Sequence, residues 1–350
     1  MAANFIELVR LRATDDPNVF ISCSFPEKMG NPADIAYGGC VMALSVQAAF
    51  KTVEGRKGKP DFEIYSLLGN YLGPTLADRN VKLRVSTLRD TRSFATRFVI
   101  ASQTQNDGSE RDTFSASVDF IAPNTIDTAS VGAPYTRYSK KPRHKYAAPE
   151  TLPTMWDILK QKVQQGAIAQ EAADVLENKI FALNKKVLIG AQPPESLHTD
   201  NGIGVDATVT SKHHANPLPE RYAADWFKSR VALGTLSPPP SSDPKALPVT
   251  SASANASLTA FVMDGALSFI PLTFSQKFLS DAGSVSSLDC ALRFHSVLNL
   301  DDFHLREMYT LAGNDCRTYS EALLWDRDEN LVATMNQSCI LRPKVDRARL

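Results

Sequence analysis

The chain has 350 residues, of which 43% are hydrophobic and 22% charged, and its 38 lysines and arginines balance 38 aspartates and glutamates. This composition is typical of a soluble globular protein and excludes a disordered or collagen-like chain. A net charge of zero argues against a nucleic-acid binder that relies on bulk electrostatics, because such a protein needs an excess of basic residues. The length favours two domains, because a domain usually contains roughly 100–200 residues.

Membrane insertion, secretion and structural metals find no support in the sequence. There is no run of 18 apolar residues, so we expect no transmembrane helix. The N-terminal stretch carries Glu7, Arg10 and Arg12 where a secretory signal would be apolar. The five cysteines are scattered without a Cys-x-x-Cys pair, which argues against a zinc site and against a disulfide framework. These features predict an intracellular enzyme or binding protein.

The first half of the chain predicts one apolar helix followed by four strands. A turn at Tyr37-Gly38 precedes the helix, which we expect over residues 39–52. The strands are expected over residues 63–72, 81–88, 93–103 and 113–122. Val81, Leu83 and Val85 alternate with polar residues, a pattern typical of a half-buried strand.

The second half repeats this order of elements. A helix expected over residues 252–269 is apolar on nearly every side, and strands are expected over residues 287–298, 304–311, 318–326 and 331–342. A helix without a polar face must be enclosed by other elements. A curved antiparallel sheet around each helix satisfies this requirement, so we predict an α+β protein built from two units of one fold.

The domain boundaries follow from this repeat. We expect an N-terminal unit over residues 1–133, a connector over residues 134–192, a C-terminal unit over residues 193–343, and a tail over residues 344–350. The connector opens with a basic, proline-broken segment, residues 140–145, and then predicts two amphipathic helices.

The first polar residue that stands out is Asp264, which interrupts the apolar helix expected over residues 252–269. A bare carboxylate among apolar groups costs several kcal/mol unless it is hydrogen-bonded or protonated. Desolvation also raises its pKa from about 3.9 towards the range of a general base. A carboxylate that caps a neighbouring backbone or pairs with an arginine fits the sequence equally well.

The second is Gln337, which has the same parity in its strand as Met335 and Cys339 and is therefore expected on the covered face of the sheet. A buried amide must find hydrogen-bond partners. Beside a catalytic carboxylate it would position a water or a substrate carbonyl. The residues alone favour a structural role instead, in which the amide bonds a loop backbone.

The better-known catalytic motifs are absent from the sequence. It contains no Gly-x-Ser-x-Gly elbow, no Walker phosphate loop and no His-Glu-x-x-His pair. The pair His213-His214 lacks a third ligand at metal-binding spacing, and an exposed loop is the more economical interpretation.

Four segments, taken in this order, resemble the acyl-CoA thioesterase II family: Tyr37-Gly38-Gly39 and residues 88–94, 287–295 and 326–337. The resemblance spans most of both units and is poor in the connector. It implies two fused hot-dog domains, each an antiparallel sheet wrapped around a long central helix.

The resemblance also implies a catalytic site. In this family a helix Asp, a Thr or Ser at the start of the next strand, and a Gln on the last strand hold the hydrolytic water, and these positions correspond to Asp264, Ser287 and Gln337. Asp264 would take a proton from the water as it attacks the thioester carbonyl. Gly38 and Gly39 would bind substrate, with backbone N–H groups near Gly39 stabilising the oxyanion. No metal or redox cofactor is required.

Ser287 has the parity of Asp289 and Ala291, which is not that of the apolar face of its expected strand. We therefore expect it to act from the start of that strand or across an interdomain face. No histidine lies in the motif to activate the hydroxyl, which argues against a serine nucleophile.

The function implied by the resemblance is hydrolysis of a fatty or related acyl-CoA to the free acid and coenzyme A. Two alternatives remain open: an acyl-thioester hydrolase specific to one pathway of specialised metabolism, and a non-catalytic acyl-thioester binder. Ala348-Arg349-Leu350 resembles the small-basic-Leu tripeptide of peroxisomal targeting. It predicts recognition by the peroxisomal import receptor, with the cytoplasm as the alternative location. Assembly into a homo-oligomer stays open.

Overall fold

The computed structural model describes residues 2–31, 33–56, 61–123, 138–234, 237 and 243–344. The tripeptide Ala348-Arg349-Leu350 and residues 134–137 at the start of the expected connector lie outside this set, so the targeting signal stays a prediction. Within the described residues no helix has the length and apolarity needed to cross a membrane.

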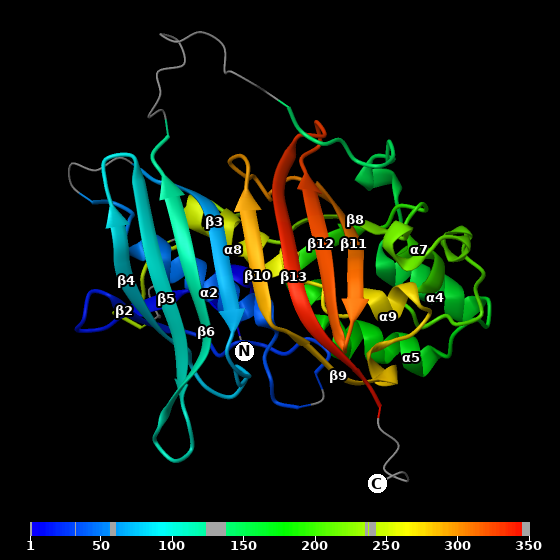
Figure 1. Ribbon diagram of the computed structural model, residues 1–350, viewed down its shortest axis with the longest axis horizontal. Helices are drawn as coiled ribbons and strands as arrows, with labels where there is room; N and C mark the ends of the chain where they lie inside the picture. Colours follow the sequence, from blue (N-terminus) through cyan, green and yellow to red (C-terminus); the bar gives the residue numbers. More distant parts are fainter. Residues whose placement is uncertain are drawn as a thin grey trace.

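One large antiparallel sheet runs through the described part of the molecule (Figure 1). Its strands lie in the spatial order β1-β2-β4-β5-β6-β3-β10-β13-β12-β11-β8-β7, and β9 pairs with one end of β13. The strands of the first half are β1 Leu11–Ala13, β2 Val19–Ser22, β3 Glu63–Tyr71, β4 Lys82–Asp90, β5 Phe94–Thr104 and β6 Glu110–Ile121. Those of the second half are β7 Leu188–Ala191, β8 Ala223–Ser229, β9 Ala282–Ser287, β10 Asp289–Phe294, β11 His304–Asn314, β12 Arg317–Trp325 and β13 Leu331–Pro343.

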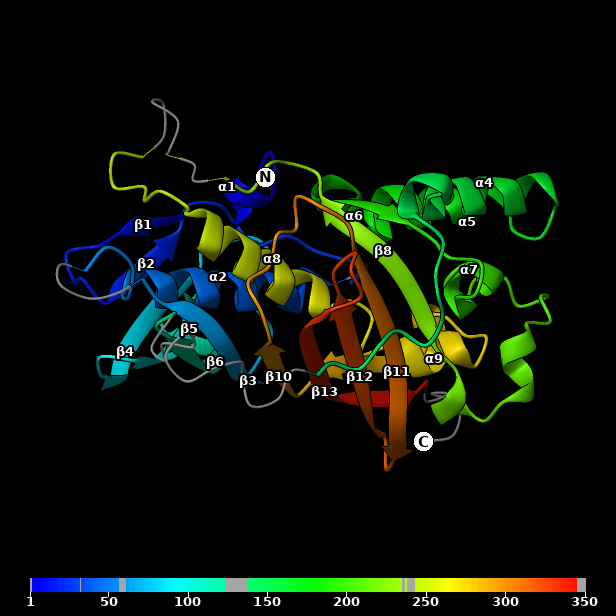
Figure 2. The same cartoon turned by 90° about the horizontal axis from the view of Figure 1, so that it is seen from above.

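The two apolar helices lie side by side on the same face of this sheet, α2 (Gly38–Lys51) over the first half and α8 (Ser251–Met263) beside it (Figure 2). Neither helix presents a polar face, and both are buried along almost their whole length. One pair of polar side chains joins the two helices: Gln47 Nε2 donates to Ser257 Oγ at 3.1 Å. This arrangement confirms the predicted α+β fold with a sheet wrapped around central helices.

The two halves join through their sheets. Strand β3 of the first half pairs with β10 of the second, with Leu67 opposite Leu292. Both leucines are fully buried in the core that also encloses α2 and α8. Residues far apart in the sequence therefore meet at this seam, and a site formed there draws on both halves.

The predicted helix over residues 252–269 is too long. α8 ends at Met263, and Asp264 is its C-terminal capping residue, after which Ala266 adopts a left-handed φ of 78°. That conformation breaks the helical hydrogen-bond ladder. A separate short helix, α9 (Ile270–Phe274), follows the turn. Asp264 is thus held at a helix end, where its side chain can leave the helix surface.

The expected strand over residues 287–298 is also divided. β9 pairs Ser287 with Cys339, whereas β10 pairs Ala291 with Asn336, so the register against β13 changes by one residue at Leu288. Such a β-bulge reverses the side of the sheet on which the residues before it lie.

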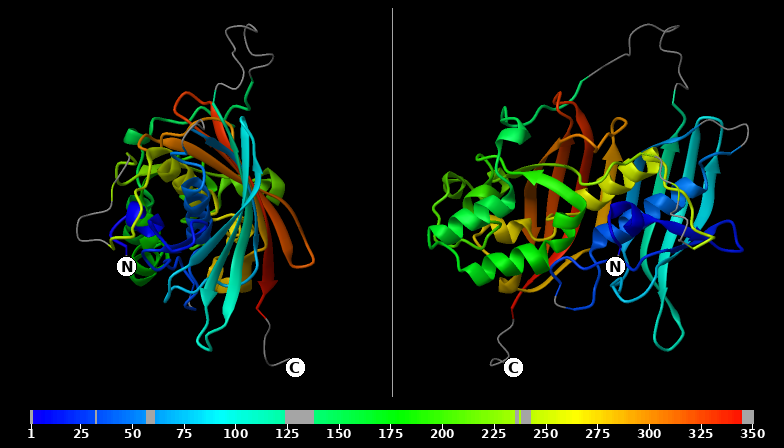
Figure 3. Two further views of the ribbon diagram at one scale, coloured as in Figure 1. Left: turned by 90° about the vertical axis from the view of Figure 1, so that its left-hand side faces the viewer. Right: turned by 180° about the vertical axis from the view of Figure 1, so that it is seen from behind.

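The connector differs from its predicted bounds because its last residues form β7, an edge strand of the C-terminal half. Its helical part comprises three helices and a π-helical turn where two amphipathic helices were expected. Seen from behind in Figure 3, these green helices cover the C-terminal half beside α8. They are α4 Met155–Gln164, α5 Gln170–Val175, the turn Leu176–Ile180 and α6 Ala182–Val187. The remaining short helices are α1 Phe5–Val9 and α7 Leu197–Asn201, with 3-10 turns at Pro149–Thr151, Lys212–Ala215, Leu218–Glu220 and Leu279–Asp281.

The basic segment at the start of the connector is docked on the sheet. The backbone N–H of Arg143 donates to the buried carboxylate of Glu307 at 2.8 Å, and Lys141 Nζ donates to the Glu329 carbonyl at 3.0 Å. Arg143 also stacks over the ring of Tyr222. These contacts give the segment a structural role on the second half of the sheet.

Candidate active site

The Asp264 carboxylate lies at the seam between the two halves and is 5% exposed. Its Oδ1 accepts two hydrogen bonds, from the Tyr71 hydroxyl at 2.8 Å and from Gln337 Nε2 at 2.7 Å. A third comes from the backbone N–H of Gly39 in the first turn of α2. The donors therefore come from β3, β13 and α2, so both halves of the chain are needed to hold this one carboxylate.

Burial raises the pKa of Asp264 above its ordinary value, and the hydrogen bonds from Gln337, Tyr71 and Gly39 offset only part of that rise. Burial and the negative charge of Asp264 together raise the pKa of the Tyr71 hydroxyl, so it stays protonated and donates. Burial likewise raises the pKa of the nearby Cys40 thiol to about 12. The carboxylate is therefore surrounded by neutral groups, the environment expected of a general base.

Gly38 and Gly39 permit the close approach of α2 to Asp264. A Cβ on Gly38 would lie 2.9 Å from Asp264 Oδ2, and one on Gly39 would lie 2.4 Å from the ring of Tyr37. The positive end of the α2 dipole consequently faces the carboxylate. The Gly39 N–H donates to Asp264, so it is not available to stabilise an oxyanion, contrary to the expectation from the sequence. The Gly38 N–H is partly exposed and has no hydrogen-bond partner among the described residues.

Gln337 lies on the inner face of β13, as its parity predicted, and is fully buried. The pairing of β13 with β12 fixes its position opposite Ser320. Its Nε2 donates to Asp264, and its Oε1 lies 3.5 Å from the Cys339 sulfur. The amide thus supports the carboxylate and does not bond a loop backbone, the role that the residues alone had favoured.

Ser287 lies on the inner face too, because the bulge at Leu288 turns it to the same side as its partner Cys339. Its hydroxyl hydrogen-bonds with the Cys339 thiol, and no hydrogen bond joins it to Asp264 or Gln337 among the described residues. The structure therefore brings Asp264 and Gln337 into contact and leaves Ser287 one residue pair away along the same face. Strand parity predicted the opposite face for Ser287, and this prediction is wrong because the alternation of apolar and polar residues does not reveal a bulge.

An arginine partner for Asp264 was the other interpretation open at the sequence level. The nearby Arg306 is instead paired with Asp225, with Nη2 and Oδ2 2.7 Å apart. Sequence reasoning missed Tyr71 altogether. It ends a predicted strand as an unremarkable aromatic residue, and the partner of its hydroxyl lies 193 positions further along the chain.

A metal centre is not indicated in the part of the chain that the structure describes, where no three His, Cys, Asp or Glu side chains converge. His213 is buried, with its Nε2 2.7 Å from the Glu195 carbonyl oxygen. The pair His213-His214 is therefore not the exposed loop pair that was expected.

Two family models match the chain. The acyl-CoA thioesterase N-terminal domain matches residues 25–126, and the acyl-CoA thioesterase C-terminal domain matches residues 205–341. The chain belongs to the acyl-CoA thioesterase family. Asp264 and Gln337 lie in the C-terminal match and Tyr71 in the N-terminal one, so the seam described above is formed by both family domains. Membership makes the protein a hydrolase of thioester bonds.

Solved structures share the fold at low sequence identity. The tesB protein of Mycobacterium avium subsp. paratuberculosis is 16% identical, with a TM-score of 0.62 over 97% of this chain and 98% of that one. Acyl-CoA thioesterase II TesB2 of Mycobacterium marinum is 19% identical, with a TM-score of 0.60 over the same shares. A hot-dog protein of unknown function from Alicyclobacillus acidocaldarius is 10% identical at a TM-score of 0.58 over 97% and 98%. No curated protein matches the sequence significantly.

Proposed function

We propose that this thioesterase hydrolyses acyl-CoA to a free carboxylic acid and coenzyme A with a water molecule activated by Asp264. One observation carries the proposal: a buried carboxylate with a raised pKa stands at the N-terminus of α2, held by Gln337 from the other end of the chain. The raised pKa suits a general base, because a base is most effective when its pKa approaches the working pH.

The reaction balances with these groups alone. The water oxygen attacks the thioester carbonyl carbon as Asp264 accepts one of its protons, which forms a tetrahedral intermediate with a negative oxygen. Collapse of the intermediate breaks the carbon–sulfur bond, and the proton held by Asp264 passes to the departing thiolate. The products are the free acid and coenzyme A, and Asp264 is again ionised.

The supporting groups have separate roles. Gln337 orients the carboxylate with its Nε2 and offers Oε1 as an acceptor for the water. Ser287 on the same face supplies a second contact for that water. The Gly38 N–H, which has no partner among the described residues, lies at the positive end of α2 and is the donor for the developing oxyanion.

The test is release of free thiol from a series of acyl-CoAs, with the acid product quantified in parallel. The proposal expects equal amounts of thiol and acid and turnover without added metal. A wild-type enzyme inert towards every acyl-CoA would refute it and leave the non-catalytic binder as the better description of this chain.

A further inference from the structure

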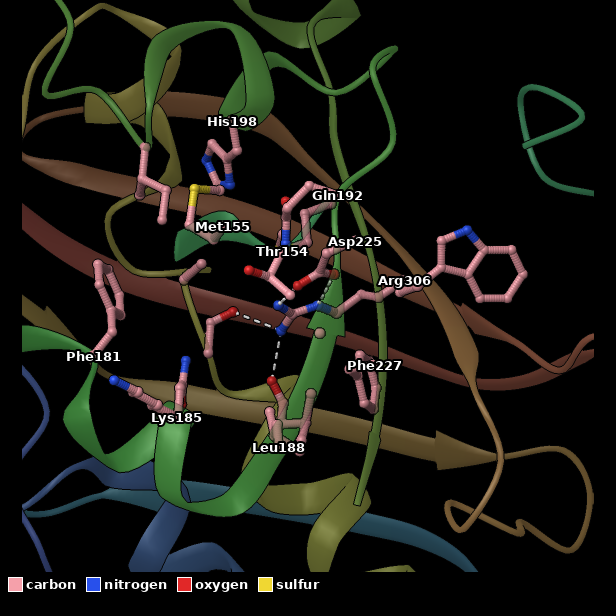
Figure 4. Close-up of a pocket in the computed structure, with 18 of the residues that line it drawn as sticks. Thr154, Met155, Phe181, Lys185, Leu188, Gln192, His198, Asp225, Phe227 and Arg306 are labelled. Atoms are coloured by element: carbon pink, nitrogen blue, oxygen red, sulfur yellow. Dashed lines mark hydrogen bonds and ion pairs between the residues drawn. The ribbon is translucent and has the colours of Figure 1, made fainter. Parts of the chain in front are cut away.

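A cavity of about 120 Å³ lies between the connector and the C-terminal half of the sheet (Figure 4). The connector forms its outer wall with Met155 and Trp156 of α4, Phe181 before α6, and Leu188 and Gly190 of β7. The opposite wall comes from β8, β11 and the turn after Asp264. The outer wall of the cavity thus comes from a segment that lies outside both acyl-CoA thioesterase domain matches.

One end of the cavity lies beside the turn that follows Asp264, although the carboxylate itself is not part of the lining. Tyr37, which precedes Gly38, and Gly265, which follows Asp264, both line it. A Cβ on Gly265 would lie 3.3 Å from the Tyr37 hydroxyl, so these two residues meet at that end. The Tyr37 hydroxyl donates to the Phe261 carbonyl at 2.5 Å, which fixes the ring against α8. A group in the cavity would therefore lie against the backbone that carries Asp264.

The charged groups of the lining already have partners, with Lys185 paired to Glu177, whereas the buried Trp226 Nε1 has none among the described residues. Arg306 forms bonds to Asp225 at 3.0 and 2.7 Å and to the carbonyls of Val262 and Gly265 at 2.6 and 3.1 Å. Figure 4 shows this paired arginine near the centre, with Met155 and His198 above its guanidinium group, Phe181 to the left and Leu188 below. His198 shares a hydrogen bond with Thr273, and burial lowers its pKa to about 4, so it is neutral. The cavity offers no unpaired charge, and its remaining surface is largely apolar.

We propose that this cavity binds the acyl chain of the substrate and sets the preferred chain length, an inference that rests on the acyl-CoA hydrolysis proposed above. Its size sets how much of an acyl chain it can enclose. An engineered apolar cavity of about 150 Å³ holds one benzene molecule, so a cavity of this size accommodates roughly six carbon atoms. The enzyme then prefers short to medium acyl groups, near hexanoyl, to acetyl and to long fatty chains.

Gly190 allows the cavity to be filled without disturbing its walls. It shares strand parity with Leu188, which also lines the cavity, so a side chain there points inward. A Cβ at Gly190 would meet only the Trp226 carbonyl, at 3.5 Å, which is an ordinary contact. Gly313 in β11 is a matched control, because its Cβ would meet only Thr318 and Arg317, at 3.7 and 3.8 Å, outside the cavity.

The experiment compares Gly190→Ala, Gly190→Leu and Gly313→Leu with wild type on acetyl-, hexanoyl- and octanoyl-CoA. We expect Gly190→Leu to lower kcat/KM for hexanoyl- and octanoyl-CoA at least tenfold more than for acetyl-CoA, and Gly313→Leu to keep the wild-type profile on all three. Gly190→Ala is included in case the leucine variant does not fold. It should lower kcat/KM for the same substrates, but by a smaller factor. Chain-length profiles that coincide with wild type in both Gly190 variants would overturn the proposal.

A binding measurement separates this inference from the proposed reaction. Trp156 and Trp226 line the cavity and report its occupancy by fluorescence. We expect S-hexyl-coenzyme A, a thioether that cannot be hydrolysed, to bind wild type at least tenfold more tightly than free coenzyme A, and Gly190→Leu to abolish most of that ratio. An enzyme that shows this binding preference but no turnover would refute the proposed hydrolysis and support acyl-chain binding in the cavity. Equal binding of the two probes to wild type would refute the cavity even if turnover is rapid.

Discussion

The most informative single substitution is Tyr71→Phe, because it removes one hydrogen bond from the Asp264 carboxylate and leaves the aromatic ring in place. The Tyr71 hydroxyl donates to Asp264 Oδ1 at 2.8 Å, and its ring packs against Phe114 with centroids 5.0 Å apart. Phenylalanine retains the ring contact, so the change is confined to the electrostatics of the carboxylate.

The expected size of the effect follows from that bond. A hydrogen bond to a charged group contributes about 1.5–3 kcal/mol, and one pKa unit corresponds to about 1.36 kcal/mol. The Tyr71 bond lowers the pKa of Asp264, so its loss should raise that pKa by roughly 1–2 units. The sign is fixed: a higher pKa keeps the base protonated to a higher pH, and activity at low pH falls.

The assay is kcat/KM for one acyl-CoA from about pH 4 to pH 9, since this parameter titrates the essential groups of the free enzyme. We expect the acidic limb of Tyr71→Phe to move upward by roughly 1–2 units, with activity recovering above it. Tyr37→Phe is the matched control, because the Tyr37 hydroxyl donates to the Phe261 carbonyl and not to Asp264. An acidic limb that stays in place, or moves equally in both variants, would refute the assignment of Tyr71 and of Asp264 as the titrating base.

Three further outcomes follow from the same geometry. Gly39→Ala should lower the free energy of unfolding in urea by about 1–3 kcal/mol and remove most of the activity, because the new methyl group would lie 2.6 Å from the Phe261 carbonyl oxygen. Unchanged stability would contradict the close approach of α2 to α8. Ser287→Ala should lower kcat/KM only about tenfold, the value of one neutral hydrogen bond, since Ser287 contacts Cys339 and not Asp264. A loss as large as that of Asp264→Asn would contradict a supporting role for Ser287. Burial depresses the pKa of His198 from 6.5 to about 4, so the stability it confers is complete above pH 6.5 and is lost as pH falls, by at most about 3 kcal/mol near pH 4. His198→Gln should flatten the pH dependence of urea unfolding between pH 6.5 and pH 4, and an unchanged slope counts against this role.

Hydrophobic periodicity predicted much of the fold and part of the site. The apolar helix over residues 39–52 corresponds to α2 within one residue at each end, because a helix without a polar face has no alternative to burial. Strand parity placed Gln337 on the inner face, and the break in apolar character marked Asp264 as an oddity. These are local signals, and periodicity reports local structure reliably.

The features that were missed depend on contacts between distant residues or on backbone irregularities. The end of α8 depends on the left-handed backbone conformation of Ala266, which cannot be predicted from an alanine in the sequence. The bulge at Leu288 decides where Ser287 points, and alternation alone cannot locate such a bulge. Tyr71 gains its role only because β3 and β10 pair across the seam. The cavity was missed because its walls come from segments far apart in the sequence, from Met29 to Met308.

The central claim is that Asp264 activates water, and Asp264→Asn tests it most directly. Asparagine keeps the shape of the side chain and removes its basicity, so kcat/KM should fall by about 10²–10⁴. Stability in urea should stay equal or rise, because the substitution removes a buried charge whose hydrogen-bond partners among the described residues are all neutral. A folded Asp264→Asn variant that releases thiol from acyl-CoA within about threefold of the wild-type rate would contradict the account.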